Sequence, residues 1–129
     1  MRYPLDELID KISIIQLKFE RIDNLDDKNK WINELRKYSQ AIGIYVGEGV
    51  CTREQAENWF NRLYEANGNI WDLEANIRKG QLEQMSMEEV GKTAIRIRES
   101  NGLRVRIKSE IVDKTGIGYK DIKINHASE

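Results

Sequence analysis

The distribution of proline most constrains how this chain can fold. Its 129 residues contain a single proline, at position 4. Because proline removes a backbone donor and breaks helix interiors, the sequence after Pro4 can form long helices. The length suits one domain with one core, and no apolar run approaches the ~20 residues of a membrane span. We therefore expect a single helical domain over residues 1–129.

Three segments carry apolar residues at alternating spacings of four and three, which is the pattern of one helical face. The first segment opens with Pro4, a favoured first-turn residue, and the second covers about 26–46. The third is preceded by Thr52 and Gln55, which form a capping box, and Gly80 is expected to end it. The three stripes are Leu8, Ile12, Ile15, Phe19 and Ile22; Trp31, Leu35, Tyr38, Ile42 and Tyr45; and Trp59, Leu63, Ala66, Ile70, Leu73 and Ile77.

The first of these helices is also apolar away from its main stripe, at Ile9, Ile14 and Leu17. A helix that is apolar on more than one side is buried in more than one direction. In so small a protein this predicts a homo-oligomer that associates through the first or second helix.

Residues 94–108, AIRIRESNGLRVRIK, are compatible with two structures. Alternating apolar and basic residues around Asn-Gly are the typical signal of a β-hairpin, but a two-stranded ribbon alone among helices is marginally stable. A helix over 87–113 would begin with a capping box of Ser86 and Glu89, and we predict this helix. Gly102 within it costs roughly 1 kcal/mol relative to Ala, which indicates a packing or ligand role. The apolar face of this helix would hold Val90, Ala94, Ile97, Val105, Ile111 and Val112.

The last residues, GIGYKDIKINHASE, start with two glycines and then alternate briefly. From about residue 117 we expect an extended arm, an edge strand or a mobile end, with His126 as an ordinary tail residue. The predicted fold is thus all-α: an antiparallel helical bundle of about four helices with a short extended C-terminal tail.

The predicted fourth helix has polar residues in the middle of its apolar face, at Asn101, Arg104 and Lys108. Buried charge is costly unless it is paired, so other helices must meet these residues. Polar residues at matching spacing are Asn67, Trp71, Glu74 and Arg78 on the third helix and Lys11 and Lys18 on the first, with Glu7 beside them. Cations exceed anions in this set, which suits a carboxylate, a phosphate or a nucleotide.

We interpret this set as a basic pocket between helices that binds a small anionic ligand, a nucleotide or another phosphorylated metabolite, without turning it over. The predicted ligand-binding residues are Lys11, Lys18, Asn67, Trp71, Glu74, Arg78, Asn101, Arg104 and Lys108. The arginines and Lys108 would meet the anion, and the other lysines would add charge. The asparagines would orient the ligand or the arginines, Trp71 would stack on a base and Glu74 would hold an arginine. Such a protein would serve as a sensor or as a sponge for a signalling nucleotide, in the way that phage proteins sequester nucleotides against host defence.

Other functions remain open. In an oligomeric scaffold or interaction protein, the polar cluster would only fix helix register, with the arginines reaching out to water. The lysines and arginines on the flank of the first helix resemble the architecture of the all-α chorismate mutases, which stabilise a polar rearrangement electrostatically. An all-α nucleotide pyrophosphatase would bind Mg²⁺ through converging carboxylates. The candidates for that role, Asp6, Asp10, Glu88 and Glu89, read more simply as charges at helix N-termini.

Charge and composition argue against several other classes of function. Residues 1–90 carry 12 basic and 17 acidic side chains, and residues 91–123 carry nine basic and four acidic ones. The basic segment, residues 91–123, would either bind an anion or pair with the acidic side chains of residues 1–90. We expect no nucleic-acid partner because the sequence contains no recognised nucleic-acid-binding motif. With Cys51 and His126 as the only cysteine and histidine, we expect no metal site and no cofactor. The N-terminus lacks a signal-peptide pattern, so we expect a cytoplasmic protein without a membrane partner.

Three stretches also carry a family resemblance. ELIDKISIIQLKFERI, LYEANGNIWDLEANIR and AIRIRESNGLRVRIKSEI, in this order, resemble a family of short, helical bacterial proteins of unknown function. The resemblance covers most of the chain and is weakest in the second helix. It implies a helix rather than a hairpin over residues 94–108, but no activity. The polar positions shared with the family are Glu7, Asp10, Lys11, Lys18, Glu20, Arg21, Asn67, Trp71, Glu74, Arg78, Asn101, Arg104 and Lys108.

Overall fold

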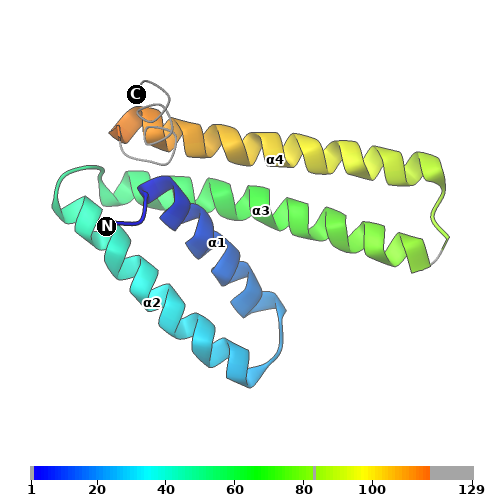
Figure 1. Cartoon of the computed structure of the whole chain (residues 1–129), viewed down its shortest axis with the longest axis horizontal. Helices are drawn as coiled ribbons and strands as arrows, with labels where there is room; N and C mark the ends of the chain where they lie inside the picture. The colour runs from blue at the N-terminus through cyan, green and yellow to red at the C-terminus, as the bar shows by residue number, and fades with distance from the viewer. Residues whose placement is uncertain (1, 83, 117–129) are drawn as a thin grey trace, which may run out of the picture.

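The computed structural model describes residues 2–82 and 84–116, and this part of the chain forms four α-helices without a strand (Figure 1). The helices are α1 (Leu5–Arg21), α2 (Leu25–Gly47), α3 (Arg53–Leu82) and α4 (Met87–Thr115). The predicted all-α fold is confirmed. The predicted tail from about residue 117, with His126, lies outside the described residues.

Both predicted capping boxes mark true helix starts. The backbone N–H of Thr52 donates to Gln55 Oε1 at 2.9 Å, and the backbone N–H of Gln55 donates to Thr52 Oγ1 at 3.0 Å. At α4, Ser86 Oγ accepts from the backbone N–H of Glu89 at 3.1 Å. These bonds satisfy N–H groups that have no partner within the first turn of a helix.

The predicted end of the third helix at Gly80 is wrong, since α3 continues to Leu82. Gly80 is buried, and a Cβ at this position would lie 2.8 Å from Met85 Cβ. The turn between α3 and α4 therefore packs directly on the helix backbone. Glycine is present because two segments approach closely, and not because the helix stops.

The ambiguous stretch 94–108 lies entirely within α4, so the Asn-Gly hairpin signal did not prevail. A Cβ at Gly102 would meet no atom within 4 Å, and the predicted packing role of this glycine is therefore wrong. The apolar face is also partly wrong. Ile111 and Val112 are buried as predicted, but Val105 is 53% exposed and Ile107 is buried in its place.

α1 lies at the centre of the packing and contacts all three other helices. Of its additional apolar residues, Ile9 and Leu17 are buried within the chain, and Ile14 is half-buried. Association with another copy was predicted because α1 is apolar on more than one side. Helices α2, α3 and α4 of the same molecule pack against these sides.

α3 and α4 form a long antiparallel pair, and the α1–α2 hairpin lies beside only one end of it (Figure 1). We call the other end, residues 70–80 of α3 and 87–101 of α4, the arm. The apolar core lies at the covered end, where Leu63 and Ile107 are almost fully buried.

Candidate functional site

Asp10 of α1 is the centre of a buried polar network. Its side chain is 4% exposed. Arg104 of α4 donates from Nε to Asp10 Oδ1 at 2.9 Å and from Nη2 to Asp10 Oδ2 at 2.5 Å. This bidentate geometry is the strongest form of the arginine–carboxylate pair. It joins two helices that are far apart in the sequence.

Asn67 of α3 connects the third helix to this pair. Its Nδ2 donates to Asp10 Oδ1 and to Ser13 Oγ, both at 2.9 Å. Ser13 Oγ in turn donates to the backbone carbonyl of Asp10 at 2.6 Å. Both Asn67 and Ser13 are buried, so each of these bonds replaces one that water cannot supply.

Lys108, one turn after Arg104, completes the network. Its Nζ lies 2.6 Å from Glu7 Oε1 and 3.7 Å from Asp10 Oδ2, and its side chain is 18% exposed. Two cations therefore face two carboxylates, and the network is balanced in charge. The sequence predicts more cations than anions here, and this prediction is wrong because Asp10 also belongs to the cluster.

The surroundings of Asp10 keep its carboxyl group charged. Burial by itself would raise the pKa of Asp10, because it penalises the charged form. Hydrogen bonds from Arg104 and Asn67, together with the positive charges of Arg104 and Lys108, outweigh burial and hold this pKa below its usual value. The network is therefore an ion-paired junction of α1, α3 and α4 at neutral pH.

Asp10 is the main residue of the site that pattern reasoning missed. Its place near the start of the first helix suggested a charge interacting with the helix N-terminus, which the structure shows to be wrong. A signal was present, since Asp10, Ser13 and Leu17 follow a spacing of three and four along one side of the helix, and all three are buried.

Several predicted site residues lie outside the network. The Nζ of Lys11 lies 5.2 Å from the ring centre of Tyr3 and 5.4 Å from that of Tyr38, so Lys11 faces α2. Lys18 is half-buried on α1 and forms no ion pair with a described residue. These two lysines do not join Arg104, and their predicted contribution to one basic pocket is wrong.

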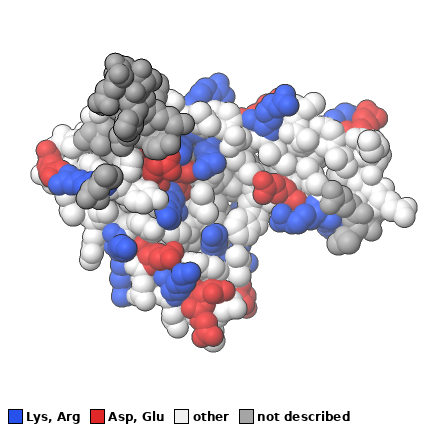
Figure 2. Space-filling view, in the orientation of Figure 1, with Lys and Arg blue, Asp and Glu red and all other residues white. Residues whose placement is uncertain are grey.

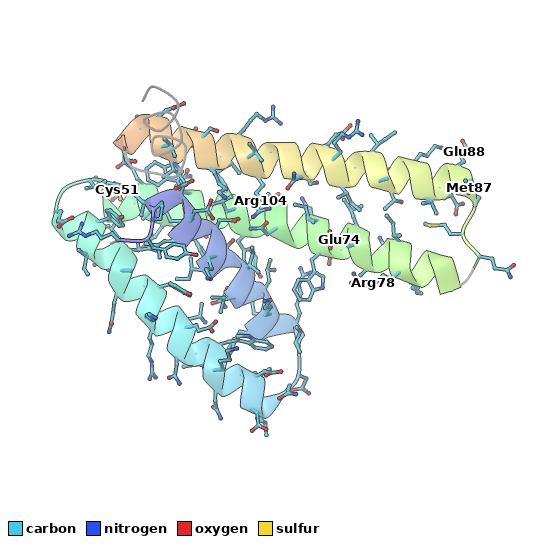
Figure 3. All side chains as sticks on the ribbon, viewed as in Figure 1. Cys51, Glu74, Arg78, Met87, Glu88 and Arg104 are labelled. Carbon is cyan, nitrogen blue, oxygen red and sulfur yellow. The ribbon has the colours of Figure 1, made fainter. Side chains whose placement is uncertain are left out.

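Glu74 and Arg78 are exposed on α3, farther along the arm than Arg104 (Figure 3). Glu74 was expected to hold an arginine, but it forms no ion pair within the described residues. The end of α1 reaches Asp72, which pairs with Arg21, but neither Glu74 nor Arg78 joins the buried network.

A groove of about 460 Å³ opens beside the network, where α1 meets α3 and α4. We call it the junction groove. It contains five of the nine predicted ligand-binding residues, together with apolar walls from all three helices. Its lining consists of Ile14, Leu17, Asn67, Ile70, Trp71, Glu74, Ala94, Ile97, Arg98, Asn101 and Arg104. Five of the predicted residues are thus brought together in a groove beside the buried network, whereas Lys11, Lys18, Arg78 and Lys108 do not line it.

Two side chains give the junction groove its chemical character. The half-buried Trp71 presents an indole ring, with the Arg21 guanidinium 5.8 Å from its centre. Arg98 is exposed and forms no ion pair with a described residue. Sequence reasoning did not select Arg98, because the predicted helical face placed it outside the polar line.

Three further cavities on the described surface, of about 490, 420 and 660 Å³, lie outside the junction groove. Figure 2 shows acidic and basic side chains interspersed on the visible face rather than one continuous basic patch. Among the described residues, no group of three or more His, Cys, Asp or Glu side chains is placed to hold a metal ion. None of the four helices combines the length and apolar character that crossing a bilayer requires.

Comparisons with known proteins add no family to these observations. No family model matches the chain, and no curated protein or solved structure is significantly similar to it.

Proposed function

We propose that this protein binds a small ligand in the junction groove without changing it chemically. The ligand would combine a flat or apolar part with an anionic group, as a nucleotide does. The observation that carries the proposal is the groove itself, in which an indole ring, apolar walls and an arginine without an ion pair to a described residue line one space. Ligand pockets typically combine apolar walls with a few polar groups in this way.

Arg98 is the group that would meet the anion. A guanidinium group binds carboxylate or phosphate oxygens through paired N–H donors. Arg104 supports this role only in part, because its Nε and Nη2 are occupied by Asp10. Its Nη1 makes one long contact, 3.4 Å to Asn101 Oδ1, so it keeps the ability to donate to a ligand.

Trp71 and Glu74 would bind the part of the ligand that carries no negative charge. The half-buried indole offers a surface on which a base stacks, worth about 1–3 kcal/mol per base in comparable sites. Glu74 is an acceptor on the same wall and would favour a ligand with an N–H group, such as the exocyclic amine of a base. Binding without turnover suits a sensor or a sequestering protein.

A purely structural role is the second candidate for the buried network, and its balanced charges favour that role. In this case the protein would be a scaffold whose network fixes helix register. The two candidates concern different residues, since ligand binding uses Arg98 and Trp71 while register depends on Asp10 and Arg104.

Native mass spectrometry of protein purified from cells tests the proposal. We expect a small molecule to be retained in fixed ratio to the chain and to be identified as a phosphorylated compound after denaturing release. Calorimetric titration with adenosine monophosphate, adenosine and inorganic phosphate then separates the two parts of the ligand. If the protein is purified empty and none of the three probes binds at millimolar concentration, the proposal is wrong and the scaffold role is favoured.

A further inference from the structure

The arm has an apolar face that is only partly covered, on the side where α1 covers the rest of the helix pair. Ile70, Ala94 and Ile97 line the junction groove together with residues of α1, which places them on this side. Ile77 lies two turns after Ile70, and Val90 lies about one turn before Ala94, so both continue the same face. We call these five residues the arm face.

The exposed fraction of the apolar residues rises along α3 toward the arm, although their spacing in the sequence stays the same. In the covered part of α3, the stripe residues Trp59, Leu63 and Ala66 are at most 4% exposed. The next members of the same stripe, Ile70, Leu73 and Ile77, are only half-buried. The apolar stripe therefore extends beyond the helix that covers it, and a partner is needed to bury the remainder.

We propose that a second copy of this chain covers the arm face, with the two arms packed antiparallel about a two-fold axis. In such a pair, any residue i of one copy that contacts residue j of the other is matched by j contacting i. The face must then be complementary to itself when reversed. An acidic side chain on the face must therefore have a basic side chain at the position that the two-fold axis brings opposite it, and α3 carries such a pair.

Glu74 and Arg78 are one helical turn apart on the flank of the arm face. Both are exposed, and neither forms an ion pair with a described residue. A two-fold axis that passes between them brings Glu74 of each copy opposite Arg78 of the other. One axis thus places two carboxylates against two guanidinium groups and covers the apolar stripe between α3 and α4.

The size of the arm predicts a reversible dimer. A surface two helices wide and four turns long would bury on the order of 1,000 Å² in total, near the lower limit for specific interfaces. The tip of the second copy would also lie over the outer part of the junction groove. The proposed dimer stands on the arm face and does not depend on any ligand.

Sedimentation velocity of the full chain without added ligand tests the pairing, from low micromolar to the highest soluble concentration. We expect the sedimentation coefficient to rise with concentration from the monomer value to the dimer value. Glu74→Arg and Arg78→Glu should each weaken the dimer at least tenfold, because each brings like charges together. The double variant, with both changes, should restore the dimer because the charges are again opposite. Both residues are exposed, so these variants test the interface with little effect on the fold.

A second pair of variants tests the apolar part. Ile77→Arg should abolish the dimer, whereas Ile95→Arg should leave it intact, since Ile95 is 56% exposed and lies away from the arm face on α4. Circular dichroism shows whether each variant remains helical. A chain that stays monomeric at every concentration would overturn the proposal and leave the arm face to a different partner. A dimer that both single charge reversals leave unchanged would show that the arm is not the interface.

Discussion

The guanidinium group of Arg104 binds both carboxylate oxygens of Asp10, at 2.9 and 2.5 Å, and so joins α4 to α1. Asn67 brings α3 to the same carboxylate. Three helices therefore converge on one buried charge. The pair defines the relative position of the α1–α2 hairpin and the α3–α4 pair more specifically than apolar contacts alone, because a bidentate bond has a single good geometry.

Removing one partner of this pair should be strongly destabilising. We expect Asp10→Asn and Arg104→Met each to lower the free energy of unfolding by about 3–5 kcal/mol, because the remaining group stays buried without its counter-charge. Urea denaturation followed by circular dichroism measures the change. Asp72→Asn is a matched control: it breaks an exposed pair with Arg21, and pairs of this kind contribute about 0–1 kcal/mol.

The same experiment separates a structural network from a strained anion site. If Arg104 and Lys108 were unneutralised, replacing both by methionine would maintain or increase thermal stability. Because Asp10 and Glu7 pair with them, we expect the double variant to be less stable than the wild type. A double variant with a higher melting temperature would contradict the balanced network.

The contribution of Asp10 should depend on pH in one direction. Its pKa is lowered in the folded protein, so its contribution is fully present above the unfolded-state pKa of about 3.9. It is lost as the pH falls toward the folded-state pKa. We therefore expect the stability difference between the wild type and Asp10→Asn to be constant near neutral pH and to shrink as the pH falls below about 5. An unchanged difference throughout acid denaturation would mean that Asp10 is not held as a carboxylate.

Two glycines within helices should respond to alanine in opposite ways. Gly102→Ala should stabilise the protein by about 1 kcal/mol, since alanine is the better helix former and open space surrounds the position. Gly80→Ala should destabilise it, because the new Cβ would lie 2.8 Å from Met85 Cβ. Thermal denaturation of the two variants side by side measures both effects. A stabilising Gly80→Ala would mean that the turn after α3 does not pack on the helix.

Ligand binding should depend on Arg98 more than on other arginines of α4. We expect Arg98→Gln to weaken binding of adenosine monophosphate about 10- to 100-fold, in line with roughly 1.5–3 kcal/mol for a hydrogen bond to a charged group. Arg106→Gln removes the same charge from an exposed position that does not line the junction groove and should leave the affinity unchanged. Equal losses in the two variants would indicate a general charge effect and would place the anion elsewhere.

The helices themselves could be predicted from local sequence. The spacing of apolar residues, the capping boxes at Thr52 and Ser86 and the single proline each act within a few residues, and the structure contains the four helices that they predict. Residues 94–108 show how a local signal is overridden. The Asn-Gly pattern does not form a hairpin here because a two-stranded ribbon would have no sheet to join, whereas a helix over the same residues packs against α3.

The composition of the site was decided by tertiary structure. Helical spacing shows which residues share a face, but not how far a neighbouring helix extends along it. α1 ends beside the first turn of the arm, where Arg21 pairs with Asp72. Glu74 and Arg78 therefore remain exposed, while Asn67, two turns earlier than Glu74, is buried. For the same reason Asp10, which local spacing assigned to a helix terminus, became the buried counter-charge of Arg104. Burial and charge pairing depend on distances between segments that are remote in the chain, and these distances exist only once the helices have packed.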